Sequence, residues 1–138
     1  MRYIGKTLAL GLVGGSLYAA LELGFRGFTH VSMFLLGGVC FIAIGLLNEL
    51  YERDMALLSQ MVVSATIITA GELAAGLVVN VWLRLGVWDY STLPYNLLGQ
   101  ISLLWSCVWF WLSLPAILLD DLLRWRWFRE EKPHYKIL

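Results

Sequence analysis

Charged residues are scarce in this sequence. Only 14% of the 138 residues are Asp, Glu, Lys or Arg, whereas a soluble domain carries about 25%. A soluble fold of this length buries only about two thirds of its surface, which is too little to hide a chain that is 59% hydrophobic. This composition excludes a soluble globular domain, and the long apolar runs predict an all-α integral membrane protein.

The sequence also lacks net charge and any pattern typical of a catalytic or metal site. Ten basic and ten acidic residues leave no overall field to attract nucleic acid. The two cysteines, Cys40 and Cys107, lie in apolar runs, and no Cys/His spacing resembles a zinc site. No nucleophile–base pair, HExxH motif or phosphate-binding glycine loop is visible. We therefore expect no enzyme activity, no metal and no cofactor.

Four apolar runs predict four transmembrane helices in a single membrane domain, residues 1–138. A span needs about 20 residues, and the runs cover roughly 6–25, 31–47, 55–83 and 97–119, followed by a tail at 120–138. The first run follows two basic residues as in a signal peptide. It lacks a convincing A-x-A cleavage site, so we expect it to be retained as the first span.

The basic residues predict the orientation of these spans. Cytoplasmic loops of membrane proteins carry an excess of Lys and Arg. In a four-span arrangement only Arg26 and Arg84 fall on one side, and the side of both termini receives Arg2, Lys6, Arg53, Arg124, Arg126, Arg129, Lys132 and Lys136. We therefore expect both termini in the cytoplasm of a multi-pass protein of the plasma membrane. The Arg- and Trp-rich tail is expected to anchor at the interface or to dock a cytoplasmic partner.

Small and polar residues recur at helical spacing along two of the predicted spans. The first-span stripe holds Gly11, Gly15, Ala19, Glu22 and Arg26, and the third-span stripe holds Ala65, Thr69, Glu72, Gly76, Asn80 and Arg84. Glycines at this spacing form a G-x-x-x-G surface that lets another helix approach closely. We therefore expect a helix bundle that forms a homo-oligomer.

Glu22 and Glu72 are predicted to lie at the same depth. At about 1.5 Å per residue each is roughly 24 Å from the cytoplasmic side, and both spans run in the same direction. Ionisable residues at such depth usually face a cavity or a partner. In one interpretation the two acids, with Asn80, Thr69 and Arg26, line a polar pathway. In the other, Glu22 pairs with Arg26 and Glu72 only bonds across a helix contact.

The segment between the third and fourth runs is rich in turn-forming and aromatic residues. It holds Trp88, Asp89, Tyr90, Ser91, Pro94 and Asn96. Asp89 is suited to an Asx-type turn, Pro94 to an extended entry into the last helix, and Asn96 to the N-cap of that helix. Trp88, Tyr90 and Tyr95 are typical of a membrane interface. We expect an external structural turn.

Two neighbouring acids follow the fourth run. Asp120 is placed to pair with Arg124 at i, i+4, and we expect a solvated helix end there. The alternative is that Asp120 and Asp121 receive a cation that leaves a pore.

Part of the chain resembles a known family. The run Glu72…Gly76…Trp82…Gly86-Val87-Trp88-Asp89-Tyr90-Ser91…Pro94…Asn96…Gly99…Ile101 resembles the signature of the putative ABC transporter type IV permease family of small multispanning membrane proteins. The earlier Glu22…Arg26-Gly27-Phe28 resembles its first-span Glu and following Asn-Arg-Gly-Phe segment, with Phe25 in place of Asn. The Gly-Pro and Pro-Ile-Tyr-Gly elements expected next are replaced by Thr29–Gly38.

The resemblance implies a transport permease, and because this chain has no P-loop, any ATPase would be a separate protein. We therefore expect a permease-like or channel-like membrane protein that passes a small solute or cation through a polar helix interface. One alternative is a holin-like oligomeric pore former of a phage or mobile element. Another is a non-transporting membrane scaffold. The expected partners are the lipid bilayer, further copies of the chain, and a separate ATPase or other membrane subunit, but no nucleic acid.

Overall fold

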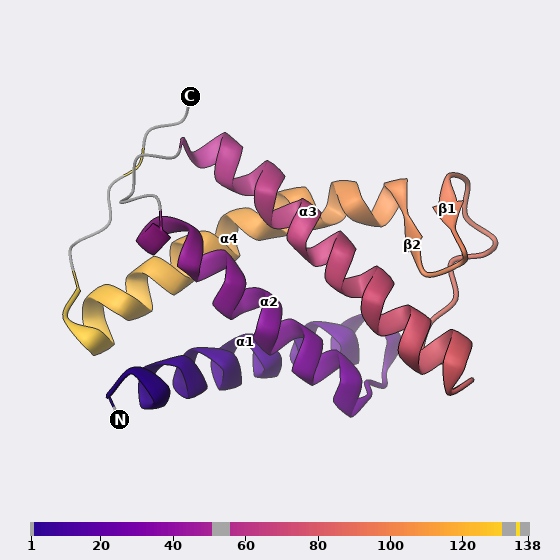
Figure 1. The fold of residues 1–138 in the computed structure, drawn as a ribbon, viewed down its shortest axis with the longest axis horizontal. Helices are drawn as coiled ribbons and strands as arrows, with labels where there is room; N and C mark the ends of the chain where they lie inside the picture. Colours follow the sequence, from indigo (N-terminus) through magenta and orange to yellow (C-terminus); the bar gives the residue numbers. More distant parts are fainter. Residues whose placement is uncertain (1, 51–55, 131–134, 136–138) are drawn as a thin grey trace.

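The computed structural model describes residues 2–50, 56–130 and 135. Apart from two short strands, these residues are helical, as the sequence predicted (Figure 1). In chain order the elements are α1 (Arg2–Arg26), α2 (Val31–Leu50), α3 (Leu57–Gly76), the π-helical segment η1 (Leu77–Trp82), β1 (Asn96–Leu97), β2 (Ile101–Ser102) and α4 (Leu103–Phe128).

The helices run back and forth along one long axis (Figure 1). The start of α1 and the ends of α2 and α4 lie at one end, here called the terminal end. The turn between α1 and α2 and the loop 83–102 lie at the other, here called the loop end. Each helix packs along the next in sequence, α1 on α2, α2 on α3 and α3 on α4. Within the described residues α1 and α4 share no comparably extensive packing, so their seam is the loosest side of the bundle.

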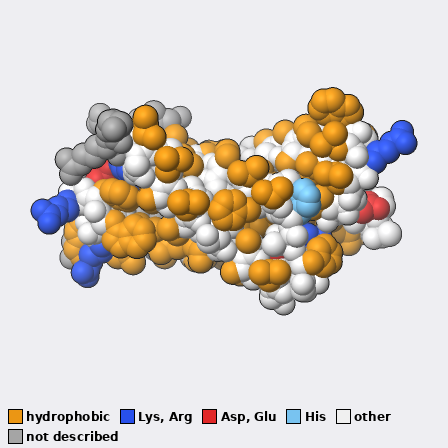
Figure 2. All heavy atoms as spheres, turned by 90° about the horizontal axis from the view of Figure 1, so that it is seen from below, with side chains coloured by type: hydrophobic (Ala, Val, Ile, Leu, Met, Phe, Trp, Pro, Cys, Tyr) orange, Lys and Arg blue, Asp and Glu red, His pale blue; other side chains and the backbone are white. Residues whose placement is uncertain are grey.

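The helices have the length and composition of membrane spans. Tyr3–Arg26, Leu57–Trp82 and Leu103–Phe128 are long and apolar enough to cross a bilayer, and Val31–Leu47 is a shorter apolar segment. Hydrophobic side chains extend along the face in Figure 2, with Lys and Arg toward its two ends. This distribution suits a hydrocarbon core about 30 Å thick, and the chain is a membrane protein. A fourth membrane crossing, by α2, stays a prediction. The orientation of the spans in the membrane also stays a prediction. Three of the basic residues used to predict it, Arg53, Lys132 and Lys136, lie outside the described residues.

Glycines bring α1 and α2 into close contact. A Cβ added at Gly38 would lie 2.7 Å from the carbonyl oxygen of Gly11, and one at Gly15 would lie 2.6 Å from that of Phe34. The glycine surface of the first span therefore serves a close helix contact, as expected, but the partner is α2 of the same chain. The homo-oligomer stays a prediction that this surface no longer supports.

The third predicted run is a single helix whose winding changes near its end. It is α-helical up to Gly76 and π-helical from Leu77 to Trp82. Arg84 lies beyond the helix, is exposed, and has a left-handed backbone with φ of 55°. The placement of Arg84 on the polar stripe was therefore wrong, and the helical part of the stripe ends at Asn80.

The last helix begins later than predicted, because its expected first turn is a small hairpin. Asn96–Leu97 pairs with Ile101–Ser102 as antiparallel strands, and α4 begins only at Leu103. Ser102 caps the helix, since its Oγ accepts a hydrogen bond from the Trp105 N–H at 3.2 Å. The prediction of Asn96 as the cap was therefore wrong. The helix also runs on to Phe128, well past the expected end near residue 119.

Candidate functional site

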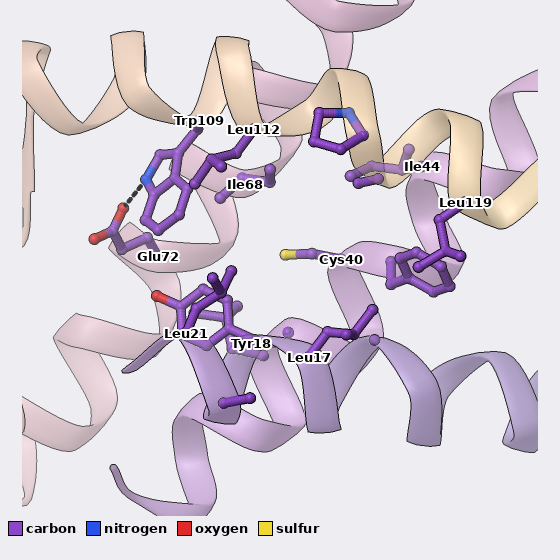
Figure 3. A pocket seen from close by; sticks show the side chains of 17 residues that line it. Leu17, Tyr18, Leu21, Cys40, Ile44, Ile68, Glu72, Trp109, Leu112 and Leu119 are labelled. Atoms are coloured by element: carbon purple, nitrogen blue, oxygen red, sulfur yellow. Dashed lines mark hydrogen bonds between the residues drawn. The ribbon is translucent and has the colours of Figure 1, made fainter. Parts of the chain in front are cut away.

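Glu72 is buried where α3 meets α4 and the loop, with 2% of its surface exposed. Its Oε1 accepts a hydrogen bond from the Tyr90 hydroxyl at 2.6 Å, and its Oε2 accepts one from the Trp109 indole N–H at 2.8 Å. Figure 3 shows the second of these bonds. A buried carboxylate is costly unless it is hydrogen-bonded and paired with a positive charge. The two donors are neutral, so they satisfy the oxygens without balancing the charge.

Glu22 lies near Glu72 but has its own cation. Arg26 Nε donates to Glu22 Oε2 at 2.6 Å, which confirms the predicted i, i+4 pair. The same guanidinium donates from Nη1 to the Val87 carbonyl oxygen at 2.8 Å, and so ties α1 to the loop. Glu22 and Arg26 therefore neutralise each other. In the described part of the chain, no cationic side chain forms an ion pair with Glu72.

Tyr18 of α1 stands close to both acids. It lies one helical turn before Glu22 on α1, and with Glu72 it lines the same cavity. Its ring centroid lies 5.8 Å from that of Trp109, and Figure 3 shows Tyr18, Glu72 and Trp109 at one end of a cavity. The two acids therefore lie close together near the loop end of the bundle.

Aromatic rings continue from Trp109 toward the loop. The centroid of Trp105 lies 5.7 Å from that of Trp109 and 6.0 Å from that of Tyr90, with the Tyr90 and Trp105 rings nearly parallel. Phe25 of α1 meets Trp105 edge-on at 6.1 Å. Such pairs contribute about 0.5–1.5 kcal/mol each beyond their buried area. They bridge α1, α4 and the loop at the loop end.

A second group of polar contacts fastens the loop to η1. Asn80 Nδ2 donates to Gln100 Oε1 at 2.8 Å, and Asn80 Oδ1 accepts from the Val87 N–H at 2.7 Å. The Trp88 indole N–H donates to the Gln100 carbonyl oxygen at 2.9 Å. A Cβ at Gly76 would lie 2.5 Å from Gln100 Oε1, so this position has no room for a side chain. These bonds hold the loop on α3 and on its π-helical end.

Two aromatics of the turn that holds Trp88, Asp89 and Tyr90 point inward, and the external location of this turn stays a prediction. Trp88 is 6% exposed and Tyr90 bonds to Glu72, whereas Tyr95 is 81% exposed. Trp88 and Tyr90 therefore pack inside the protein, and their depth at the membrane interface stays a prediction. Asp89 forms the predicted Asx turn, since its Oδ1 accepts the Ser91 N–H at 2.8 Å. This hydrogen bond lowers the pKa of the Asp89 carboxyl below its ordinary value.

The loop also holds its own polar residues in place. Asn96 Nδ2 donates to the Leu93 carbonyl oxygen at 2.8 Å, and Asn96 Oδ1 accepts the Gly99 N–H at 3.1 Å. The Tyr90 N–H donates to the Gly99 carbonyl oxygen at 2.7 Å, with Gly99 at a φ of 73°. These bonds close the loop on itself and set the Tyr90 hydroxyl over Glu72.

Thr69 lies one helical turn from Glu72 and faces α4, where its Oγ1 lies 2.8 Å from Ser106 Oγ. Thr69, Glu72 and Asn80 therefore lie on one side of the third helix, and each bonds a group of α4 or of the loop. Arg26 and Glu22 join them from α1. The structure thus gathers five of the predicted pathway residues at the loop end, each with a partner inside the chain.

An apolar cavity of about 500 Å³ extends from Glu72 toward the terminal end (Figure 3). All four helices line it, and apart from Glu72, Tyr18, Cys40 and Trp109 its lining is aliphatic, phenyl, proline or glycine. The side formed by α2 is buried, whereas the residues contributed by α1 and α4 are largely exposed: Leu17, Ala20, Leu21, Leu112 and Pro115. The cavity therefore opens sideways at the seam between α1 and α4.

The sequence interpretation missed Tyr18, Gln100, Trp109 and the cavity. Tyr18 is four residues before Glu22, so helical spacing already puts the two on one face. Trp109 lies three residues after Ser106, on the face that carries the serines of the last span. The cavity has no comparable signal, because apolar residues from four separate helices enclose it.

The terminal end carries a second polar cluster. The sequence predicted a solvated helix end here, but the cluster is buried. Asp120 is fully buried, and Asp121 and Arg124 are 2% and 3% exposed. Arg124 Nε donates to Asp120 Oδ2 at 2.8 Å, so the i, i+4 pair is confirmed. Lys6 pairs with Glu130, and the Tyr135 hydroxyl donates to Asp121 Oδ2 at 2.9 Å. These contacts join α1, α4 and the start of the tail.

Within the described residues, no group of three or more His, Cys, Asp or Glu side chains is placed to hold a metal ion. A family model described as putative ABC-transporter type IV matches residues 9–129. The matched range includes both acids, the loop and every residue that lines the cavity. No curated protein and no solved structure matches the chain.

Proposed function

The chain belongs to the putative ABC-transporter type IV family, and on that premise we propose that it is a membrane component that moves a small solute across the bilayer. The observation that carries the proposal is the cavity beside the buried carboxylate of Glu72. In this proposal the protein is a multi-pass component of the plasma membrane with both termini in the cytoplasm. A separate ATPase, further copies of the chain or another membrane subunit complete the system.

The size of the cavity supports a bound solute. Its volume of about 500 Å³ falls within the roughly 300–1,000 Å³ of small-molecule sites. Because the cavity opens sideways at the seam between α1 and α4, an occupant can enter it without unfolding the bundle.

The position of Glu72 supports a role in solute passage. It lies at the border between the cavity and the loop that covers the loop end, and the Tyr90 hydroxyl bonds to it from that loop. A solute group that bonds to Glu72 competes directly with Tyr90. Solute binding is thereby linked to release of the loop, which opens the cavity toward the outer side. The two states of the site are then a closed one, in which Tyr90 bonds to Glu72, and an open one, in which the solute bonds to Glu72 instead.

The scaffold hypothesis also has a specific observation in its favour. Both oxygens of Glu72 are already bonded, as expected of a residue that only joins helices and loop. In that case Glu72→Gln lowers stability and leaves the movement of every solute unchanged. The holin-like hypothesis predicts something else, leakage of all small solutes when the chain is produced in excess.

The test uses cells of the organism that encodes the protein, so that any partner subunit is present. Exchange of a panel of labelled solutes is measured in cells that lack the chain and in cells that carry the wild type, Glu72→Gln or Asp89→Asn. The panel comprises rubidium, a sugar, an amino acid and an alkylammonium ion. Asp89→Asn is the matched control, because it removes an exposed carboxylate from the same end and keeps an oxygen that accepts the Ser91 N–H.

We expect one solute class to exchange faster in cells that carry the wild type than in cells that lack the chain. The exchange rate of that solute should fall in the Glu72→Gln variant and stay at the wild-type level in the Asp89→Asn variant. The transport proposal is overturned if every solute of the panel exchanges at the same rate in cells that lack the chain and in cells that carry the wild type. If the wild type moves a solute and Glu72→Gln moves it equally well, Glu72 is not part of the pathway.

A further inference from the structure

We propose that the cavity between α1 and α4 binds an amphiphilic organic cation, with its cationic group beside Glu72 and its apolar body in the cavity. Such a cation is the substrate class of the proposed transport site, and its role in transport rests on the proposed function. Its binding can be measured without transport.

The charges at the loop end favour a cation. Arg26 is bonded to Glu22 and to the Val87 carbonyl oxygen, so it is already engaged away from Glu72. When Glu72 is ionised, its negative charge has no cationic partner among the described residues, because Arg26 pairs with Glu22. Burial makes that charge costly. A positively charged ligand supplies the missing partner, whereas an anion would add a second negative charge beside the first.

The aromatic rings favour an organic cation. The rings of Tyr18 and Trp109 lie at the Glu72 end of the cavity, with centroids 5.8 Å apart (Figure 3). Cations are attracted to the faces of Trp and Tyr rings, and quaternary ammonium groups are recognised in this way. Both rings lie beside the carboxylate, so a diffuse positive charge contacts an aromatic face and the acid at once.

The lining of the cavity excludes a bare metal ion. Hard cations need several oxygen ligands, about six to eight for Ca²⁺. Among the lining side chains, oxygens come only from the Glu72 carboxylate and the Tyr18 hydroxyl. Such an ion would lose its water without replacement. A cation with hydrocarbon or aromatic substituents has weaker hydration and buries its apolar surface against Leu17, Phe41 and Leu112.

The open side of the cavity indicates where the ligand enters. Leu17 and Leu21 of α1 and Leu112 of α4 are 44%, 56% and 38% exposed and line its rim. All three lie within segments that are long and apolar enough to span the bilayer. Toward the terminal end the seam is closed by a core cluster that includes Leu10, Phe41 and Leu123. An amphiphile dissolved in the lipid therefore reaches Glu72 sideways.

The test is equilibrium binding of radiolabelled tetraphenylphosphonium to the full chain in lipid nanodiscs. Tetraphenylborate is the matched probe, because it carries four phenyl rings around a negative centre. We expect saturable binding of the phosphonium ion and none of the borate. Glu72→Gln should weaken phosphonium binding by about tenfold or more, which corresponds to about 1.4 kcal/mol. Asp89→Asn should bind like the wild type.

A second variant tests the cavity independently of the acid. Leu112→Trp places a larger side chain at the exposed rim and leaves Glu72, Tyr90 and Trp109 unchanged. It should also weaken phosphonium binding, while its thermal unfolding midpoint stays close to that of the wild type. This variant keeps the test valid if Glu72→Gln fails to fold.

Three results would overturn the proposal: no saturable phosphonium binding to the wild type, equal binding of the borate, or unchanged binding in a folded Glu72→Gln or Leu112→Trp variant. The outcome is separate from that of the exchange assay. If solute exchange depends on the chain but phosphonium does not bind, the organic-cation site is rejected and the transport function stands. If phosphonium binds but no solute exchange depends on the chain, the ligand site stands and the transport function is rejected.

Discussion

The Glu72 carboxylate of α3 and the Tyr90 hydroxyl of the loop lie 2.6 Å apart, although the two residues belong to separate segments of the chain. The same carboxylate receives the Trp109 N–H from α4. One buried acid therefore joins α3, α4 and the loop 83–102 at the loop end of the cavity. Its two partners are expected to differ in role, because Tyr90 belongs to the loop and Trp109 to the rigid bundle.

Tyr90→Phe should loosen the loop and leave the bundle intact. The change removes one donor from a buried carboxylate, and an unsatisfied buried partner costs about 1–3 kcal/mol. Burial, followed by the charge of Glu72, raises the pKa of the Tyr90 hydroxyl, so this group stays protonated and donates throughout the neutral range. We expect faster proteolysis of the loop 83–102 and faster amide exchange there. Tyr95→Phe, at an 81% exposed position, is the control and should change neither rate.

Some of these contacts could be predicted from the sequence, because they are local. The Glu22–Arg26 and Asp120–Arg124 pairs follow from i, i+4 spacing, and the Asp89 turn follows from the preference of Asp for backbone N–H groups. The helical character of the apolar runs follows from the need of each backbone group for an internal partner in lipid.

Other features depend on contacts between segments that are distant in sequence. Trp88 looked like an interfacial aromatic, yet it is buried because Gly76 leaves room for its ring on α3 and Gln100 accepts its N–H. The late start of α4 has a similar cause, since residues 96–102 bond to each other and to Asn80 instead of to a helical turn. Burial of Asp120 depends on Gly45 of α2, where a side chain would collide with the carboxylate.

Arg26→Gln should destabilise the attachment of α1 to the loop. It removes the ion pair with Glu22 and the bond to the Val87 carbonyl oxygen. The Arg26 side chain is 27% exposed, so solvent reduces the loss, and we expect about 1–3 kcal/mol in the free energy of unfolding. Arg84→Gln is the control, because Arg84 is an exposed cation at the same end, and its effect should stay within about 0.5 kcal/mol.

The double variant Glu22→Gln/Arg26→Gln measures how strongly the pair is coupled. Residues in direct contact show interaction energies of about 0.5–3 kcal/mol in double-mutant cycles. We expect the double variant to be more stable than the sum of the two single changes predicts. Strict additivity in denaturant unfolding would show that the 2.6 Å contact contributes nothing to stability.

Gly38→Ala should separate α1 from α2. The new methyl carbon would lie 2.7 Å from the Gly11 carbonyl oxygen, which belongs to the backbone and moves only with its helix. Overpacking of this kind costs about 1–3 kcal/mol. Gly24→Ala is the matched control on α1, because a Cβ there meets nothing within 4 Å and Ala favours the helix by about 0.5–1 kcal/mol. The two variants should therefore shift the thermal unfolding midpoint in opposite directions.

The Asp89 turn should show a defined pH dependence. Its hydrogen bond to the Ser91 N–H lowers the pKa of Asp89 in the folded protein. The stabilisation is therefore present above the unfolded-state pKa, about 3.9, and is lost as the pH falls through the lower folded-state pKa. Protection of the Ser91 amide, measured by NMR, should decline only in that acidic range. In Asp89→Asn, which cannot titrate there, the decline should be absent.

Arg124→Met should be the most destabilising of these changes. Arg124 is 3% exposed and donates to the fully buried Asp120, so its removal leaves a buried carboxylate without its cation. Breaking a buried pair from one side costs about 3–5 kcal/mol. The double variant Asp120→Asn/Arg124→Met removes both charges and should recover part of that loss, because the buried carboxylate of Asp120 is then absent along with its cation. If the double variant is no more stable than Arg124→Met, Arg124 acts through its contacts with Glu130 and α4 and not through the charge of Asp120.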